Sequence, residues 1–116
     1  MNETQKQFVL VIKTKNPKFD MMGFMIARSW LDNQNADIAI YLKFDSVELM
    51  RKENIENTPE LKAEVDYLLS KGVPIYVCGF CSRACDISKE SLYPGIELGN
   101  RNIFYSLMSE RKAVYF

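Results

Sequence analysis

Runs of apolar residues mark the strands that the sequence predicts. The run 8–12 is continuous and largely β-branched, and polar Gln7 and Lys13 bound it. A continuous run of this kind is typical of a strand buried on both faces, as in a parallel sheet, so alternation cannot assign its side chains to a face. The other predicted strands are 36–44, 73–77, 95–99 and 113–116.

The segment 59–71 carries the clearest helical pattern in the chain. Thr58 can cap the helix, and Pro59 suits its first position because proline lacks the N–H that goes unpaired there. Apolar side chains then recur at helical spacing and form one stripe, at Leu61, Val65, Leu68 and Leu69. Lys71 and Gly72 end the pattern in the way expected of a helix C-terminus.

The helical segment 19–33 has a wide apolar arc. Its apolar side chains exceed what one face of a sheet can cover, at Met21, Met22, Phe24, Met25, Ile26, Trp30 and Leu31. Such a helix either lies deep in the core or places one edge against another subunit. Further helices are predicted at 81–86 and 102–111. Loops are predicted at 45–57, with one short turn at 47–50, and at 88–94.

Strands and helices alternate along the chain in the order β-α-β-loop-α-β-α-β-α-β. This order predicts an α/β fold with three layers, α/β/α, in which helices cover both faces of a mostly parallel sheet of about five strands. No internal repeat, low-complexity tract or shift in composition divides the sequence. We therefore expect a single domain over residues 1–116.

Composition and charge exclude several classes of protein. The 116 residues are 47% hydrophobic and 26% charged, which is typical of a globular chain. Fifteen Lys and Arg balance fifteen Asp and Glu without a basic cluster, so no nucleic-acid partner is expected. No run approaches the ~18 apolar residues of a membrane span, and the polar start is unlike a signal peptide. These features predict a cytoplasmic protein.

Histidine is absent from the chain. Its absence excludes Ser-His-Asp and Cys-His catalysis, His-ligated zinc and proton transfer by imidazole. A thiol, a carboxylate, a lysine or water must therefore handle a nucleophile or proton at neutral pH. Three cysteines lie within eight residues, at Cys78, Cys81 and Cys85. In a cytoplasmic protein, such a cluster is more often reactive or metal-binding than disulfide-bonded.

Cys78 follows the third predicted strand directly, at the carboxyl end where open α/β sheets form their sites. Gly79 comes next and allows a sharp turn and the close approach of a substrate. If a helix begins at Cys81, its free N–H groups and its dipole favour a thiolate nearby, and Arg83 adds positive charge. Cys78 and Cys81 together form a C-x-x-C pair.

Four interpretations of the cysteines remain open. Small buried apolar side chains are the simplest, and we favour this interpretation for Cys85. A metal site would have three thiolates but no fourth ligand unless subunits share it, so neither a metal nor a cofactor is expected. A dithiol redox pair is the third, because the segment 77–81 is locally similar to the C-G-x-C motif of thioredoxins. A single reactive nucleophile at Cys78 is the fourth.

Nearly the whole chain resembles the DsrE/DsrF-like family, which includes the TusD-type sulfur-relay proteins. The resemblance rests on the Asn16-Pro17 loop, the segment 72–79 (GVPIYVCG), the segment 95–99 (GIELG) and the terminal segment 112–116 (KAVYF). One departure follows the second cysteine. Such proteins commonly read Arg-Gly-Ile there, whereas this chain reads Cys85-Asp86-Ile87.

The resemblance implies a persulfide carrier or sulfurtransferase, with a reactive cysteine at Cys78 and a second at Cys81. Gly79, Phe80 and Arg83 are the candidate binding residues. The resemblance also implies homotrimers, hexamers or hetero-oligomers, and protein donors and acceptors of sulfur. A net charge of zero adds no repulsion against a homo-oligomer. A dithiol redox protein and a non-catalytic oligomeric binding module of the same fold are the alternative functions.

Overall fold

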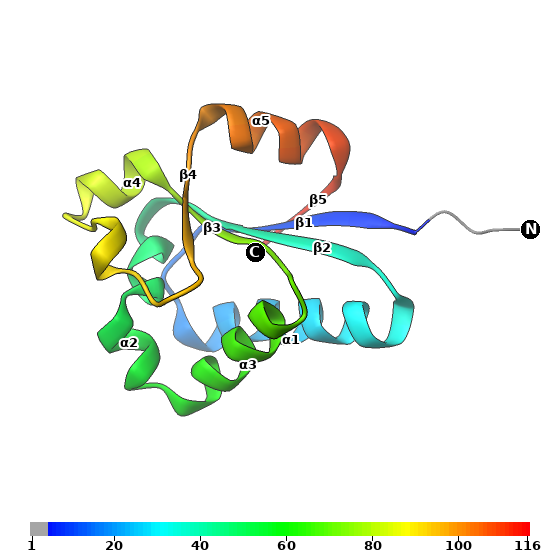
Figure 1. Ribbon diagram of the computed structural model, residues 1–116, viewed down its shortest axis with the longest axis horizontal. Helices are drawn as coiled ribbons and strands as arrows, with labels where there is room; N and C mark the ends of the chain where they lie inside the picture. Colours follow the sequence, from blue (N-terminus) through cyan, green and yellow to red (C-terminus); the bar gives the residue numbers. More distant parts are fainter. Residues whose placement is uncertain (1–4) are drawn as a thin grey trace, which may run out of the picture.

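Five parallel strands form one sheet in the computed structural model, which describes residues 5–116. The strands are β1 (Gln7–Ile12), β2 (Asp37–Leu42), β3 (Ile75–Cys78), β4 (Glu97–Gly99) and β5 (Lys112–Tyr115). Their order across the sheet is β4-β3-β2-β1-β5, and every neighbouring pair is parallel. The predicted α/β fold with a parallel five-stranded sheet is therefore confirmed (Figure 1).

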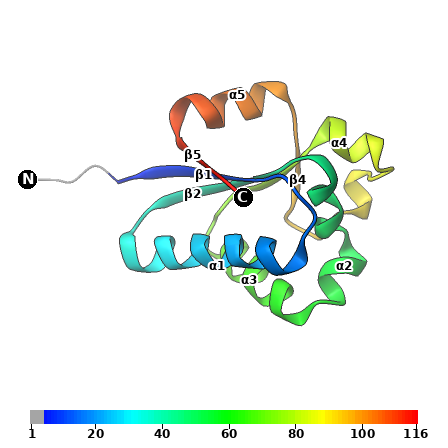
Figure 2. The same cartoon turned by 180° about the vertical axis from the view of Figure 1, so that it is seen from behind.

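Helices cover both faces of this sheet. The α-helices are α1 (Pro17–Gln34), α2 (Lys52–Glu56), α3 (Pro59–Ser70), α4 (Gly79–Ala84) and α5 (Arg101–Glu110), and the 3-10 helices are η1 (Phe44–Met50) and η2 (Lys89–Ser91). Helices α1 and α3 lie on one face and α5 lies on the other (Figures 1 and 2). Within the described residues, no helix is long and apolar enough to cross a membrane.

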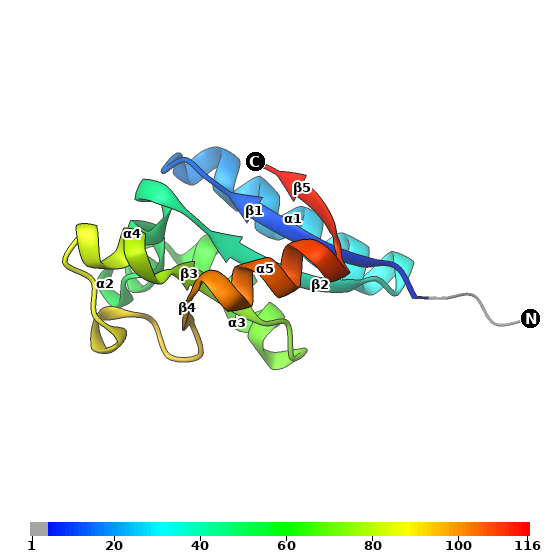
Figure 3. The ribbon, with the colours of Figure 1, turned by 90° about the horizontal axis from the view of Figure 1, so that it is seen from above.

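The position of α5 follows from the strand order. The chain moves from β1 through β2 and β3 to β4 in one direction, and α5 then returns across the sheet to β5 at the opposite edge. Crossovers between parallel strands are right-handed, so this reversal of direction places α5 on the opposite face from α1 and α3. Figure 3 shows α5 running obliquely over the strands on its own side.

The continuous apolar run of β1 packs on both faces, as its pattern predicts. Leu10 and Ile12 belong to the large core under α1 and α3, whereas Val9 and Val11 belong to a smaller cluster on the α5 face. All four side chains are inaccessible to solvent. In β2, Ala39 and Tyr41 are likewise buried on the α5 side. Alternation along each strand therefore decides which face a side chain meets.

Helix α1 divides its wide apolar arc between core and surface. The Asn16 side chain accepts a hydrogen bond from the Phe19 N–H and caps the helix, and Pro17 occupies its first turn. Phe24 and Ala27 are buried, while the apolar side chains of Phe19, Met22 and Met25 are exposed. The helix is thus only in part a deeply buried core helix. One of its polar residues, Asp20, is also buried, which the sequence pattern did not indicate.

Three segments differ from their predicted local structure, and one of them is the predicted loop 88–94, which contains η2. The segment 45–57, predicted as a loop with one turn, contains η1 and α2. The short helix predicted at 81–86 begins earlier, at Gly79, so that Cys78 itself is the residue that caps it. At α3, Thr58 occupies the cap position, but its hydroxyl donates backwards to the Asn54 carbonyl instead of capping the helix.

Candidate functional site

The carboxyl ends of three neighbouring strands define the candidate site. Strands β2, β3 and β4 are adjacent and parallel, so their ends meet at one edge of the sheet. The register pairs Leu42 with Val77 and Cys78 with Gly99. Lys43, which follows β2, and Asn100, which follows β4, therefore reach the same edge as Cys78. This is the edge at which open α/β sheets bind ligands.

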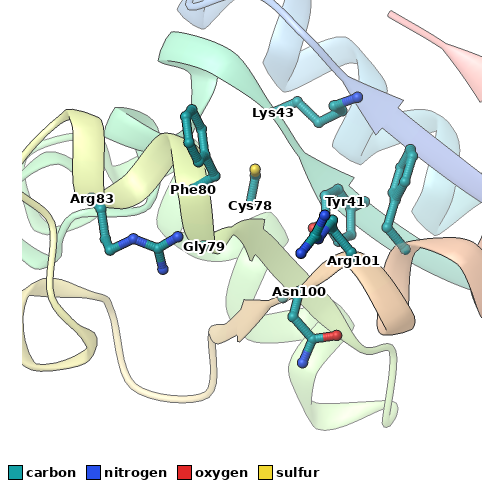
Figure 4. Close-up of a pocket in the computed structure, with 10 residues that line it drawn as sticks. Tyr41, Lys43, Cys78, Gly79, Phe80, Arg83, Asn100 and Arg101 are labelled. Atoms are coloured by element: carbon teal, nitrogen blue, oxygen red, sulfur yellow. The ribbon is translucent and has the colours of Figure 1, made fainter.

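A cavity of about 600 Å³ opens at this edge, on the α5 side of the sheet. Its size lies within the range of small-molecule sites, which is roughly 300–1,000 Å³. Figure 4 shows Cys78 between Phe80 and Arg83 on one side and Lys43, Tyr41 and Arg101 on the other. The residues that line the cavity are Tyr41, Lys43, Cys78, Gly79, Phe80, Arg83, Gly99, Asn100, Arg101 and Phe104.

Two glycines in the cavity lining, Gly79 and Gly99, allow close packing of their neighbours. A Cβ atom on Gly79 would lie 2.6 Å from the Gly99 carbonyl oxygen, and a Cβ on Gly99 would lie 2.6 Å from a ring carbon of Tyr41. Both distances are too short for real carbon contacts, so no larger residue fits at either position without a shift of its neighbours. The value of Gly79 lies in this close approach of two backbones, and its φ angle is not in the left-handed region.

The two cysteines of the C-x-x-C pair face different surroundings. The Cys78 thiol lies in the cavity and accepts a hydrogen bond from the Cys81 N–H at 3.4 Å, which caps α4. The Cys81 thiol accepts a hydrogen bond from the Phe44 N–H at 3.1 Å. Phe44 has a φ of 56°, in the left-handed region, which is uncommon for a bulky residue. The unusual backbone of Phe44 thus faces Cys81 and not the cavity lining.

Burial affects the ionisation of two groups around Cys78. Burial and the adjacent Cys78 thiol raise the pKa of Cys81, and the Phe44 N–H and the Lys43 ammonium offset only part of this effect. Cys81 is therefore a protonated thiol at neutral pH and a poor nucleophile. Burial also raises the pKa of Tyr41, with further contributions from the thiols of Cys78 and Cys81. The Tyr41 hydroxyl is thus protonated and available as a hydrogen-bond donor beside Cys78.

The structure brings together most of the candidate residues predicted from the sequence. Cys78, Gly79, Phe80 and Arg83 all line the cavity, whereas Cys81 packs behind it. Sequence reasoning missed the remaining lining residues, which are Tyr41, Lys43, Gly99, Asn100, Arg101 and Phe104. Lys43, Gly99 and Asn100 end or follow predicted strands, but the sequence does not show which strands lie next to β3.

Cys85 lies apart from this arrangement. It is half-buried at the end of α4, packs against the large core, and its carbonyl accepts a hydrogen bond from the Arg51 guanidinium at 2.8 Å. The three cysteines do not converge on one point. Among the described residues, no group of three or more Cys, Asp or Glu side chains could hold a metal ion.

Comparisons with solved structures show the same fold in other proteins. The crystal structure of the ychN protein from E. coli superimposes with a TM-score of 0.84 at 20% sequence identity, over 97% of this chain and 100% of that one. A protein of unknown function, MTH1491 from Methanobacterium thermoautotrophicum, superimposes with a TM-score of 0.81 at 16% identity, again over 97% and 100% of the two chains. At these identities, the likeness shows the fold alone.

Comparison of the sequence with curated proteins gives no match. The family model described as the DsrE/DsrF-like family matches residues 5–116, which is almost the entire chain. The match includes all five strands and every residue that lines the cavity. The chain therefore belongs to the DsrE/DsrF-like family.

Proposed function

We propose that this protein carries sulfur as a persulfide on Cys78 and passes it to an acceptor thiol. The observation that carries the proposal is the position of the Cys78 thiol in a 600 Å³ cavity at the carboxyl ends of β2, β3 and β4. Membership of the DsrE/DsrF-like family, which includes sulfur-relay proteins, supports the same function. The proposed steps require that the Cys78 thiol reacts as a nucleophile.

The chemistry needs only a thiolate and a leaving group. The Cys78 thiolate attacks the outer sulfur of a donor persulfide, the S–S bond of the donor breaks, and the donor leaves as a thiolate with the bonding electron pair. Cys78 then carries the outer sulfur as a persulfide, and no external oxidant or reductant takes part. Attack by a thiolate needs no general base, which suits a chain without histidine.

Cys81 acts after Cys78 in this scheme. Because its pKa is raised by burial and by the Cys78 thiol, Cys81 remains protonated while Cys78 reacts. It then serves as a resolving thiol or as a second acceptor of the sulfur. The three free cysteines suit a reducing compartment such as the cytoplasm, which is where we place the protein.

A dithiol redox function is the second candidate. One observation favours it: the Cys81 N–H donates to the Cys78 thiol, so the C-x-x-C pair occupies a single turn at a strand-to-helix junction. Such a pair would cycle between dithiol and disulfide without acquiring sulfur. A persulfide donor distinguishes the two functions, because only the carrier gains mass.

Mass spectrometry after incubation with a persulfide donor tests the proposal. We expect one added sulfur atom on the peptide that contains Cys78, none in Cys78→Ser, and normal loading in the matched control Cys85→Ser. Cys78→Ser should unfold at nearly the same urea concentration as the natural protein, since the substitution is close to isosteric. Loading of Cys85 in place of Cys78, or no added sulfur on either, would contradict the carrier function.

Self-association is part of the proposal. The exposed apolar side chains of Phe19, Met22 and Met25 on α1 support a homo-oligomer, a trimer or a multiple of it, because monomers rarely leave such a group uncovered. Methionine side chains adapt readily to a partner surface. Light scattering at micromolar concentration checks this expectation, and a mass equal to that of one chain would contradict it.

A further inference from the structure

The cavity around Cys78 concentrates positive charge. Lys43, Arg83 and Arg101 line it, and its ten lining residues include neither Asp nor Glu. The chain as a whole has equal numbers of basic and acidic residues, so this local excess is not a reflection of overall composition. Within residues 5–116, none of the three cations makes a salt bridge, although five such bridges form elsewhere. The charges of the cavity are therefore available to a ligand.

Arg101 occupies a position that helix stability does not favour. It is the first residue of α5, and the first turn of this helix carries no acidic residue. The N-terminus of a helix is the positive end of its dipole, where a carboxylate stabilises and a cation destabilises. Arg101 thus adds its charge to a terminus that is already positive. Residues that break a local rule in this way are expected at functional sites.

Lys43 is held at the cavity by aromatic rings. Its ammonium lies 4.6 Å from the centroid of the Phe104 ring and 5.2 Å from that of the Phe44 ring. The Phe104 ring in turn packs against Tyr41, with 4.7 Å between their centroids. These contacts hold the charge beside an apolar wall. A ligand that fits must combine an anionic group with an apolar or organic part.

Arg83 brings a third charge to the other side of the thiol. Its Nη1 atom would lie 3.8 Å from a Cβ atom built on Gly79, so the guanidinium is close to the residue next to Cys78. Figure 4 shows Arg83 and Lys43 on opposite sides of Cys78. An anion that approaches the thiol therefore meets positive charge from α4, from the end of β2 and from the start of α5.

We propose that Cys78 takes its sulfur from low-molecular-weight persulfides that carry carboxylate groups, which Lys43, Arg83 and Arg101 bind. This inference rests on the proposed function and names the class of donor for the same site. The bonds that change are those of the carrier step: the Cys78 sulfur bonds to the outer sulfur of the donor, and the donor leaves as an anionic thiolate. The three cations also stabilise the negative charge that develops on this leaving thiolate.

Two aromatic disulfides test anion selection at Cys78 independently of sulfur transfer. The dianion 5,5′-dithiobis(2-nitrobenzoate) and the uncharged 4,4′-dithiodipyridine both react with thiolates, and each releases a product that is followed by its absorbance. The reactions use the Cys81→Ser/Cys85→Ser protein, in which Cys78 is the single thiol. We expect Lys43→Gln/Arg101→Gln to lower the ratio of the two rates, dianion to neutral, by about tenfold, as for the loss of electrostatic attraction.

The matched control is Lys112→Gln, which removes an exposed positive charge at the start of β5, at the opposite end of the sheet. The ratio of its two disulfide reaction rates should equal that of the parent Cys81→Ser/Cys85→Ser protein. Added salt should slow the dianion more in the unsubstituted protein than in the double variant, because salt screens the attraction. A ratio that is unchanged in the double variant, or lowered equally in the control, would overturn the inference. Circular dichroism establishes that each variant is folded.

Persulfides of glutathione complete the test. Glutathione persulfide keeps its carboxylates, whereas the persulfide of glutathione diethyl ester has them blocked. We expect glutathione persulfide to load Cys78 faster than the persulfide of the diethyl ester does. This preference should be lost in Lys43→Gln/Arg101→Gln. Equal loading from both donors would overturn the donor class and leave the carrier function intact. A third outcome is that the double variant lowers the ratio of the two disulfide reaction rates while no donor adds sulfur to Cys78. That result would overturn the carrier function, but the selection of anions at this thiol would stand.

Discussion

The two faces of the sheet are covered to very different degrees. On one face, α1 and α3 enclose a large core, in which Phe24, Leu68 and most inward side chains are inaccessible to solvent. On the other face, α5 alone covers a cluster of four buried residues, and none of its own residues is buried. The thinly covered face carries Cys78 and its cavity. The large core and the cavity that contains the proposed nucleophile thus lie on opposite sides of one sheet.

Leu68→Ala should have the largest effect of the substitutions that test this comparison. Leu68 on α3 is fully buried, so the substitution should lower the free energy of unfolding by roughly 2–5 kcal/mol. Leu107→Ala on α5 is the matched change on the other face. Because Leu107 is half-buried, we expect a loss below about 2 kcal/mol. Urea denaturation measures both, and equal losses would mean that the two faces contribute alike.

Gly99→Ala should have the next largest effect. The added methyl group would meet the Tyr41 ring, so we expect a loss of about 1–3 kcal/mol, which is the usual cost of overpacking. Ser106→Ala, on the exposed side of α5, is the control and should stay within about 0.5 kcal/mol of the natural protein. If Gly99→Ala matched this control, the α5 face would be loose enough to absorb a methyl group beside Cys78.

The smallest effect concerns the ionisation of Cys81, which packs on one face only. Cys78 packs against both clusters, whereas Cys81 packs only against the large core. Burial and the Cys78 thiol raise the pKa of Cys81, so the pH midpoint of its alkylation by iodoacetamide should lie above that of a free thiol, ~8.5. Peptide mass spectrometry over a pH series measures the extent of alkylation at each cysteine.

In Cys78→Ala, one of the two causes of the raised Cys81 pKa is removed. The alkylation curve of Cys81 should therefore move to lower pH without reaching that of a free thiol, because burial remains the larger cause. An alkylation midpoint for Cys81 at or below pH ~8.5 in the unsubstituted protein would contradict a raised pKa.

Most of the fold could be predicted from the sequence because its strong signals are local. The continuous run that became β1 and the stripe that became α3 each fill a whole element with one periodic pattern. The elements η1 and α2 gave no such signal, since a 3-10 helix and a five-residue helix are too short to show a period. The left-handed backbone of Phe44, a bulky residue, had no sequence signal either.

The candidate site could be predicted only in the stretch of chain around Cys78. The strand end and Gly79 mark that stretch, and Phe80 and Arg83 lie within it. Lys43 and Arg101 belong to other strand ends, and only the order β4-β3-β2 brings them beside Cys78. Sequence pattern gives each strand but does not give its neighbours, so the charges of the cavity could not be assembled before the structure.

The contacts from Gly79 to Gly99 and from Gly99 to Tyr41 have a consequence for how this site can diversify. The backbone next to Cys78 is packed against the backbone of Gly99, whereas Phe80, Arg83 and Arg101 occupy exposed positions around the cavity. Exchange of these three side chains would alter the lining of the cavity without disturbing the packed backbone beside Cys78. If Cys78 is the nucleophile that we propose, the same scaffold can acquire new specificities by substitution of exposed residues alone.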